Sequence, residues 1–188
     1  MTGRGQALIL LEGYRGGVWV IMVREVAKNP GEVMPMPASE KRIAVGSDER
    51  THLTDQVLDS LRKRGYQIEL FGALGTDSPQ WPLVGQHVAQ RVASGACQQG
   101  VLFCWTGTGV AMAANKTPGA RAALCTEAQT AAGARKWNDA NILCMSLRLT
   151  SAAVAEEILN AWFSTPVDEA ERANIEILEE MDTVPAGR

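Results

Sequence analysis

Short apolar runs alternate with helical periods along the chain from Lys41 onward, and this alternation limits the folds that the sequence can adopt. The apolar runs predict strands at 42–46, 66–72, 100–104, 120–125 and 141–146. The helical periods predict helices at 53–64, 81–95, 110–116, 126–136, 155–162 and 165–181. Strands separated by helices pair in parallel through right-handed crossovers. We therefore expect an α/β fold, a doubly wound, Rossmann-like three-layer sandwich with a parallel sheet of about five strands.

Two of these helices are preceded by residues that typically begin a helix. Thr126 with Gln129 forms a capping box, which predicts that a helix begins there. The segment 165–168, Thr-Pro-Val-Asp, supplies a cap, a proline and an acidic residue for a last helix that reaches about Met181. Apolar side chains at helical spacing before it predict a helix with one buried face, at Ala155, Ile158, Leu159 and Trp162.

Composition excludes several classes of partner. The 188 residues, 46% of them hydrophobic, suffice for one folded unit, and the net charge of −3 is spread without a basic patch, which argues against nucleic acid. The four cysteines form no CxxC pair, as expected of free thiols in a reducing cytoplasm. Only two histidines are present, so we expect no metal site. We also expect no membrane span, because no apolar run approaches the required length of ~20 residues.

The first forty residues are treated separately. We interpret 1–40 as an extension or linker without fixed order, because 28–41 holds three prolines and a glycine. The extension is a poor signal peptide, and Met22, Met34 or Met36 is an alternative start of the chain. An ordered N-terminal strand or hairpin packed on the domain fits the residues equally well.

The strand ends select the candidate site. In open α/β sheets ligands bind beyond the carboxyl ends of the strands, here at 46–49, 71–77, 104–109, 125–127 and 146–148. The third segment combines a thiol, Cys104, with a loop containing Gly107 and Gly109. Glycines let backbone amides turn toward a ligand, and a helix that starts near Val110 adds unpaired N–H groups, so the loop suits an anion.

Two interpretations of this loop compete. A dinucleotide fingerprint would use Gly107, Gly109 and Glu127, but its third glycine position is Met112 and the loop follows the third strand instead of the first. The alternative is a proton-transfer site, in which Cys104 is a base and the amides hold an enediolate oxygen. This chemistry requires no cofactor or metal.

The competing role for Cys104 is that of a small buried hydrophobe, which is the role we expect for Cys125 and Cys144. Cys104 differs because loop amides and a helix start follow it, and such surroundings lower the pKa of a thiol. We therefore favour Cys104 as the reactive cysteine.

The segment 104–125 is similar to one in the B-type ribose-5-phosphate isomerases and the galactose-6-phosphate isomerase subunits. It reads CWTGTGVAMAANKTPGARAALC, against the family pattern Cys-Gly-Thr-Gly-x-Gly…Ala-Asn-Lys-x-Pro-Gly-x-Arg-Ala. Supporting matches are IAVGSDE at 43–49, WNDANIL at 137–143 and EEILNAWF at 156–163. The similarity spans roughly 42–164, which makes 41–188 the expected sugar-phosphate isomerase domain.

The resemblance implies a cofactor-free aldose–ketose isomerase of a sugar phosphate. It also implies a homodimer or homotetramer whose active sites are shared between subunits. By motif position Cys104 is the base, and Thr106 helps to orient the sugar. Asp48 and Asn138 hold sugar hydroxyls, and Arg148 contacts the phosphate. The anion hole consists of the amides of Trp105, Thr106, Gly107, Thr108 and Gly109.

The departures from the family pattern define the alternatives. The ring-opening histidine of the family is Trp137 here, and the histidine after the first aspartate is Glu49. Trp105 replaces a glycine, and of the C-terminal arginines only Arg172 has a counterpart, with Ile175 or Glu176 at the second position. Either the substrate is a short open-chain sugar phosphate, such as a tetrose phosphate, or Glu49 or His52 opens the ring.

Trp105 and Trp137 then either stack on the substrate or pack at a subunit interface. Two further hypotheses stay open. One is a non-catalytic phosphosugar-binding or partner subunit of a heteromeric isomerase, and the other is an epimerase of a non-phosphorylated sugar acid.

Overall fold

The computed structural model describes residues 8–15, 18–25 and 41–183, and the chain divides into two units, 1–39 and 40–188. The first unit holds an antiparallel pair, β1 (Leu8–Arg15) and β2 (Val18–Glu25). Met22 lies within β2, whereas the linker predicted at 28–40, with Met34 and Met36, lies outside the described residues. A hairpin is therefore present in the extension.

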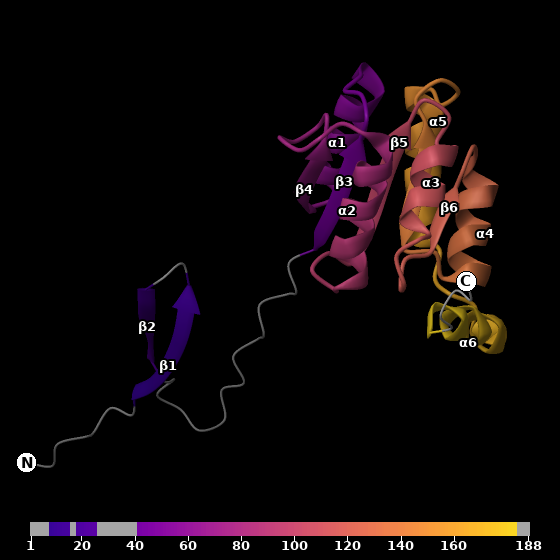
Figure 1. Cartoon of the computed structure of the whole chain (residues 1–188). Helices are drawn as coiled ribbons and strands as arrows, with labels where there is room; N and C mark the ends of the chain where they lie inside the picture. Colours follow the sequence, from indigo (N-terminus) through magenta and orange to yellow (C-terminus); the bar gives the residue numbers. More distant parts are fainter. Residues whose placement is uncertain (1–7, 16–17, 26–40, 184–188) are drawn as a thin grey trace, which may run out of the picture. The chain divides into compact units, whose positions relative to one another are not determined.

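The second unit is built on one parallel sheet, as predicted. Its strands are β3 (Arg42–Ser47), β4 (Gln67–Gly72), β5 (Gln99–Cys104), β6 (Ala122–Leu124) and β7 (Ile142–Ser146). Their order across the sheet is β4-β3-β5-β7-β6, with every neighbouring pair parallel (Figure 1). The chain leaves β3 in one direction and returns to β5 on its other side, so β3 and β5 flank the topological switch point.

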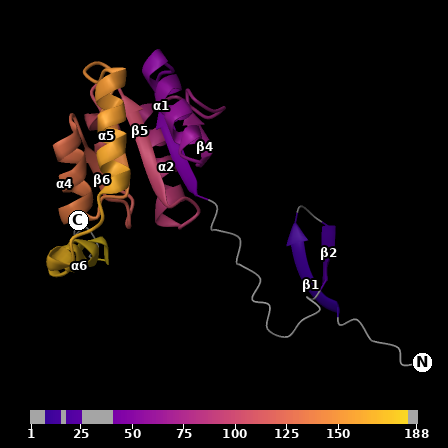
Figure 2. The same cartoon turned by 180° about the vertical axis from the view of Figure 1, so that it is seen from behind.

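Helices cover both faces of this sheet. α2 (Trp81–Ala93) and α3 (Thr108–Ala114) pack on the face that Figure 1 shows in front. α1 (His52–Lys63), α4 (Ala128–Asn138) and α5 (Ala152–Ser164) pack on the opposite face, seen in Figure 2. The predicted apolar stripe of α5 is buried, and its Trp162 indole donates a hydrogen bond to Gln99 Oε1 over 2.9 Å. The predicted doubly wound sandwich is confirmed.

Alternation along the strands decides which layer each side chain enters. In β5, Val101 and Phe103 belong to the core under α1, α4 and α5, whereas Leu102 and Cys104 belong to the core under α2 and α3. Both sets are buried, because a parallel sheet is covered on both faces. The Cys104 side chain therefore extends into the α2–α3 layer.

Two helix ends differ from the predictions. The capping box at Thr126 is wrong, because Glu127 is the N-cap of α4 and its carboxylate accepts hydrogen bonds from the amides of Gln129 and Thr130. A longer acidic side chain reaches both free amides at once. The last predicted helix is broken into a short turn at Glu169–Glu171, α6 (Arg172–Glu180) and a turn at Met181–Thr183.

An arginine network ties α6 to the end of α4. Arg121 donates to the Asp139 carboxylate and carbonyl, each over 2.8 Å, and contacts Glu179 of α6 at 3.4 Å. The Asp168 amide donates to the Lys136 carbonyl over 2.8 Å. These bonds fix α6 against the edge of the sheet at which the strands begin. No helix among the described residues has the length and apolar character of a membrane span.

We expect Arg121→Ala to lower the free energy of unfolding by about 2 kcal/mol, because it leaves the partly buried Asp139 without one of its cationic partners. The matched control is Arg62→Ala, which breaks an exposed pair with Asp59 and should cost less than about 0.5 kcal/mol. Urea unfolding of both variants is the measurement, and equal losses would contradict the structural role of Arg121.

Candidate active site

The carboxyl ends of β3 and β5 bring Asp48, Glu49 and the 104–109 loop to the switch point. Cys104 ends β5, and its carbonyl accepts hydrogen bonds from the amides of Gly107, at 3.2 Å, and Leu147, at 3.0 Å. The first bond closes the loop on itself, and the second joins it to the segment after β7. The backbone around the thiol is therefore held from two sides.

The Cys104 side chain lies below the loop, with 5% of its surface exposed. It packs in the α2–α3 core with Val110 and Cys144. All four cysteines are free, as expected. Burial raises the pKa of Cys125 to about 12 and that of Cys144 well above its ordinary value, so both remain neutral thiols at physiological pH.

The loop itself depends on Gly107, which adopts a φ of 77° and precedes α3. A Cβ there would lie 2.5 Å from Leu124 Cδ1 and 3.0 Å from the Met145 carbonyl. Thr106 and Thr108 join their hydroxyls over 2.6 Å. Thr108 and Gly109 begin α3, so their amides have no acceptor within the helix, and the Thr106 amide makes no hydrogen bond in the described part of the chain. These three amides are therefore available to an anionic ligand.

Asp48 is half-buried beside this loop, and its Oδ1 atom is buried without a hydrogen-bond partner in the described part of the chain. Burial raises the pKa of its carboxyl, and the Glu49 charge adds to the increase, against the opposing effect of a backbone hydrogen bond. An unsatisfied carboxyl oxygen of this kind suits a ligand hydroxyl. Glu49 is exposed, and its backbone is fixed by the Ser47 hydroxyl, which donates to the Glu49 carbonyl over 2.6 Å.

Ser146 lies in the 146–148 segment that the strand ends select, but sequence reasoning assigned it no role. It is buried at the end of β7, and its hydroxyl donates to the Trp105 carbonyl over 2.8 Å. The same carbonyl accepts from the Arg148 amide at 3.1 Å. The signal was a serine ending the apolar run at 141–146. Ser146 thus connects the Cys104 loop to the loop that carries Arg148.

The structure places Trp137, Asn138 and Arg172 at the other edge of the sheet. Trp137 and Asn138 end α4, shortly before β7 begins at Ile142, and Arg172 starts α6. Because the helices run antiparallel to the strands, this is the edge at which the strands begin, opposite Cys104 (Figure 1). A single chain therefore does not bring these three residues to the thiol.

The two histidines lie in different places. His52 is exposed at the first position of α1, four residues after Asp48, and stays an alternative to Glu49 for ring opening. His87 is half-buried, with its ring centroid 6.3 Å from that of Phe71. The dinucleotide interpretation fails at Glu127, whose carboxylate caps α4. In the part of the chain that the structure describes, no group of three or more His, Cys, Asp or Glu residues could hold a metal ion.

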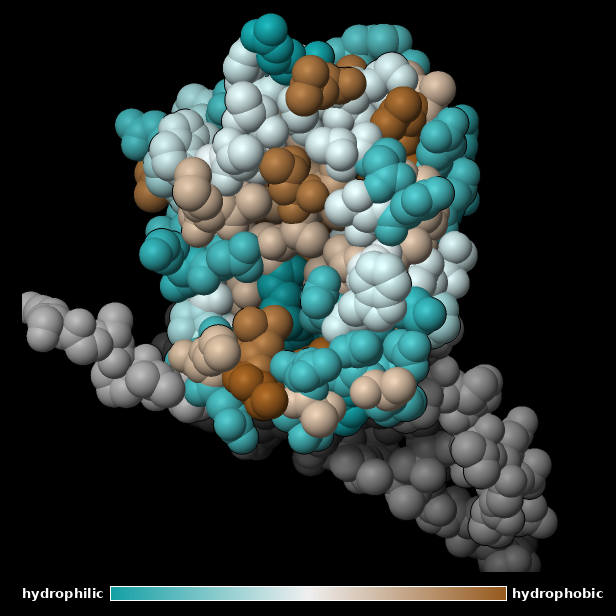
Figure 3. All heavy atoms as spheres, turned by 90° about the vertical axis from the view of Figure 1, so that its right-hand side faces the viewer, coloured by the Kyte–Doolittle hydropathy of each residue, from teal (hydrophilic) through white to brown (hydrophobic). Residues whose placement is uncertain are grey.

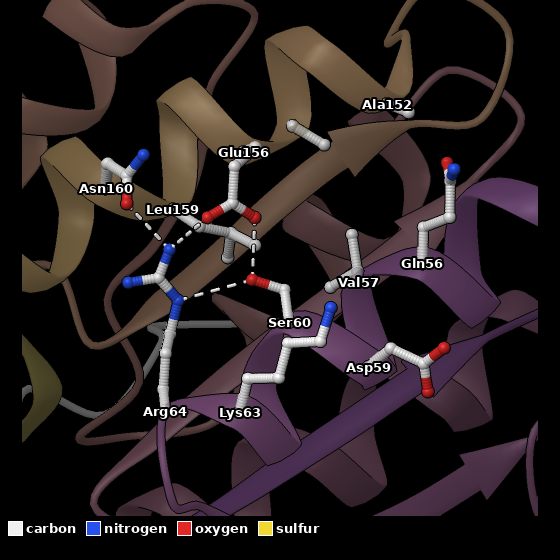
Figure 4. Close-up of a pocket in the computed structure, with 11 residues that line it drawn as sticks. Gln56, Val57, Asp59, Ser60, Lys63, Arg64, Ala152, Glu156, Leu159 and Asn160 are labelled. Carbon is white, nitrogen blue, oxygen red and sulfur yellow. Dashed lines mark hydrogen bonds and ion pairs between the residues drawn. The ribbon is translucent and has the colours of Figure 1, made fainter.

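Two cavities lie away from the thiol. A groove of about 600 Å³ separates α1 from α5, but its arginine is engaged, since Arg64 bonds Glu156 at 2.5 Å and Asn160 at 2.7 Å (Figure 4). A smaller cavity of about 350 Å³ includes Asn138, Leu178 and Met181. Figure 3 faces the right-hand side of the view in Figure 1 and shows a hollow with hydrophilic side chains in it and a hydrophobic patch below it.

These observations define a class: a Rossmann-like α/β protein whose candidate ligand site lies at the switch point of its sheet. Comparison with known proteins then identifies the family. The sequence model described as Ribose/Galactose Isomerase matches residues 43–179. The chain therefore belongs to the ribose/galactose isomerase family and is an isomerase by class.

Individual relatives agree with this assignment. Ribose-5-P isomerase B of Listeria innocua is 30% identical, over 75% of this chain and 97% of its own length. D-erythrulose-4-phosphate isomerase of Pectobacterium atrosepticum is 34% identical, over 64% of this chain and 80% of its own length. The solved ribose-5-phosphate isomerase B of Clostridium thermocellum is 36% identical, with a TM-score of 0.70 over 75% of this chain and 97% of its own.

We expect Gly107→Ala to reduce the isomerisation rate at least about 10-fold, because a Cβ at positive φ shifts the loop amides. The control is Gly95→Ala, which has a φ of 72° but nothing within 4 Å of the added Cβ. It should lower stability by about 1 kcal/mol while leaving the rate unchanged. Thermal unfolding and initial rates measure both, and equal rates in the two variants would contradict the role of the loop.

Proposed function

We propose that the chain is an aldose–ketose isomerase of a phosphorylated sugar, with Cys104 as the base. The observation that carries the proposal is that Cys104 ends β5 at the switch point, directly before the loop whose amides are free. Membership of the ribose/galactose isomerase family supports the same reaction.

The reaction transfers a proton between C1 and C2. The Cys104 thiolate removes the C2 proton of the aldose, and the electron pair forms the enediolate double bond while the C1 oxygen becomes negative. The amides of Thr106, Thr108 and Gly109 hold that oxygen. The same thiol returns the proton to C1, the hydroxyl proton of O2 moves to O1, and the ketose forms.

Neighbouring side chains bind the hydroxyls and the phosphate of the sugar. The unpartnered Oδ1 atom of Asp48 accepts a sugar hydroxyl, and Thr106, bonded to Thr108, orients the sugar. Arg148 receives the phosphate. Glu49, exposed at the rim, is the candidate ring-opening group for a cyclic substrate.

A second copy of the chain completes the site. Trp137, Asn138 and Arg172 lie at the edge opposite Cys104, so they serve a site only across an interface. Exposed apolar side chains accompany both edges: Trp81 and Met112 near the loop, and Leu178 and Met181 beside Asn138. We propose a homodimer or homotetramer in which these surfaces meet, an arrangement that suits a cytoplasmic enzyme with free thiols.

A second candidate function is the isomerisation of a four-carbon sugar phosphate. Trp137 cannot transfer the proton that ring opening needs, and a tetrose 4-phosphate cannot close a furanose ring because its O4 carries the phosphate. The Pectobacterium relative is named for such a four-carbon substrate. The four-carbon substrate is therefore favoured over ribose 5-phosphate if Glu49 proves dispensable.

A substrate panel tests the reaction. Four- to six-carbon aldose and ketose phosphates are incubated with the full chain in deuterated water, and we expect deuterium at C1 or C2 of at least one of them. Cys104→Ser should reduce the exchange by about 100-fold or more, since a general base contributes about 10²–10⁴.

Phosphosugar binding without exchange would indicate the non-catalytic partner subunit instead. Exchange into a sugar acid that lacks phosphate, without exchange into the phosphates, would indicate the epimerase.

Mixing two inactive variants tests the shared site. Cys104→Ser removes the thiol from one edge and Asn138→Ala alters the other, so a mixed dimer holds one intact site of two. After unfolding and refolding together, we expect about a quarter of wild-type activity. Separate refolding of each variant is the control, and a mixture no more active than its components would contradict shared sites.

A further inference from the structure

Trp105 and Arg148 are joined through their backbones. The Trp105 carbonyl accepts the Arg148 amide at 3.1 Å and the buried Ser146 hydroxyl at 2.8 Å. Both bonds use main-chain atoms of Trp105, so they persist whatever side chain stands at that position. The two side chains consequently emerge next to each other from a fixed backbone.

The Arg148 guanidinium contacts the indole of Trp105. The Arg148 Cζ atom lies over the Trp105 ring, 6.0 Å from the ring centroid, within the range of a cation–π contact. The Trp105 ring remains 56% exposed, so the contact with Arg148 lies at the surface. The indole therefore restricts Arg148 without burying it.

Arg148 also differs in charge pairing from the other arginines whose side chains the structure describes. Among the described residues, Arg148 has no carboxylate partner. Each of the others pairs with an aspartate or glutamate, namely Arg42, Arg50, Arg62, Arg64, Arg91, Arg121, Arg135 and Arg172. Arg148 is thus a cation left unneutralised at the mouth of the Cys104 loop.

From these observations we propose that Trp105 is a positioning residue, whose indole face holds the Arg148 guanidinium in place to receive the phosphate of the substrate. The inference rests on the proposed function for the role of Arg148. It also explains a tryptophan at a position where a glycine would leave the long Arg148 side chain free to rotate. An arginine already restricted in conformation loses less entropy when it binds an anion.

The test is a double-mutant cycle with inorganic phosphate as the probe, measured by calorimetry on the full chain. We expect Trp105→Leu to weaken phosphate binding about 3- to 10-fold and Trp105→Phe, which keeps a ring, less than about 2-fold. Arg148→Met should weaken it more strongly. In Arg148→Met, the further change Trp105→Leu should have no effect, because the indole acts through the guanidinium.

Leu149→Ala is the matched control, since Leu149 follows Arg148 in the same loop and is 71% exposed. It should leave phosphate binding unchanged. On a substrate that shows exchange, Trp105→Leu should raise KM with kcat changed less than about 2-fold. Additive losses in the cycle, a loss in Trp105→Phe equal to that in Trp105→Leu, or wild-type protein that fails to bind phosphate would each overturn the inference.

Failure of the two proposals is distinguishable. If the wild type exchanges deuterium but the losses of phosphate affinity in the double-mutant cycle are additive, the isomerase proposal stands and the positioning role of Trp105 is wrong. If the losses are not additive but no sugar exchanges deuterium, the Trp105–Arg148 anion site stands and the isomerase proposal is wrong.

Discussion

The Cys104 carbonyl is the point on which the candidate site depends. Its two hydrogen bonds, from the amides of Gly107 and Leu147, close the loop after β5 and join it to the loop after β7. The first bond gives the loop the turn in which its amides are free, and the second brings Arg148 beside Trp105. One backbone oxygen thus holds together the thiol, the free loop amides and the unpaired Arg148 cation.

The segment that carries the family resemblance serves structure as well as chemistry. The Asn115 side chain bonds both the amide and the carbonyl of Ala122, at 2.7 and 2.8 Å, and so pairs with the strand β6 at the edge of the sheet. Arg121 fixes Asp139 and α6 at the far edge. The first part of this segment therefore forms the loop after β5. Its second part positions α6 and the surface that, in the proposed oligomer, contacts a second copy.

Much of the fold followed from periodicity, since buried strands must be continuous apolar runs and the helices between them need one apolar stripe. The predicted helix ends were wrong where neighbouring residues could also cap or interrupt the helix. Glu127 caps α4 in place of Thr126, and the last helix is interrupted around Arg172. In the site, the role of Ser146 was not predicted because it depends on a carbonyl 41 residues away in the sequence.

The sequence alone determined the parallel α/β sandwich, the thiol at a strand end and the glycine-rich loop, because each depends on residues adjacent in the chain. Only the tertiary structure decided that Cys104 extends into the α2–α3 layer, that Arg148 meets Trp105, and that Trp137, Asn138 and Arg172 lie at the opposite edge. These placements depend on the order of strands and the direction of helices in space, which spacing along a chain does not specify.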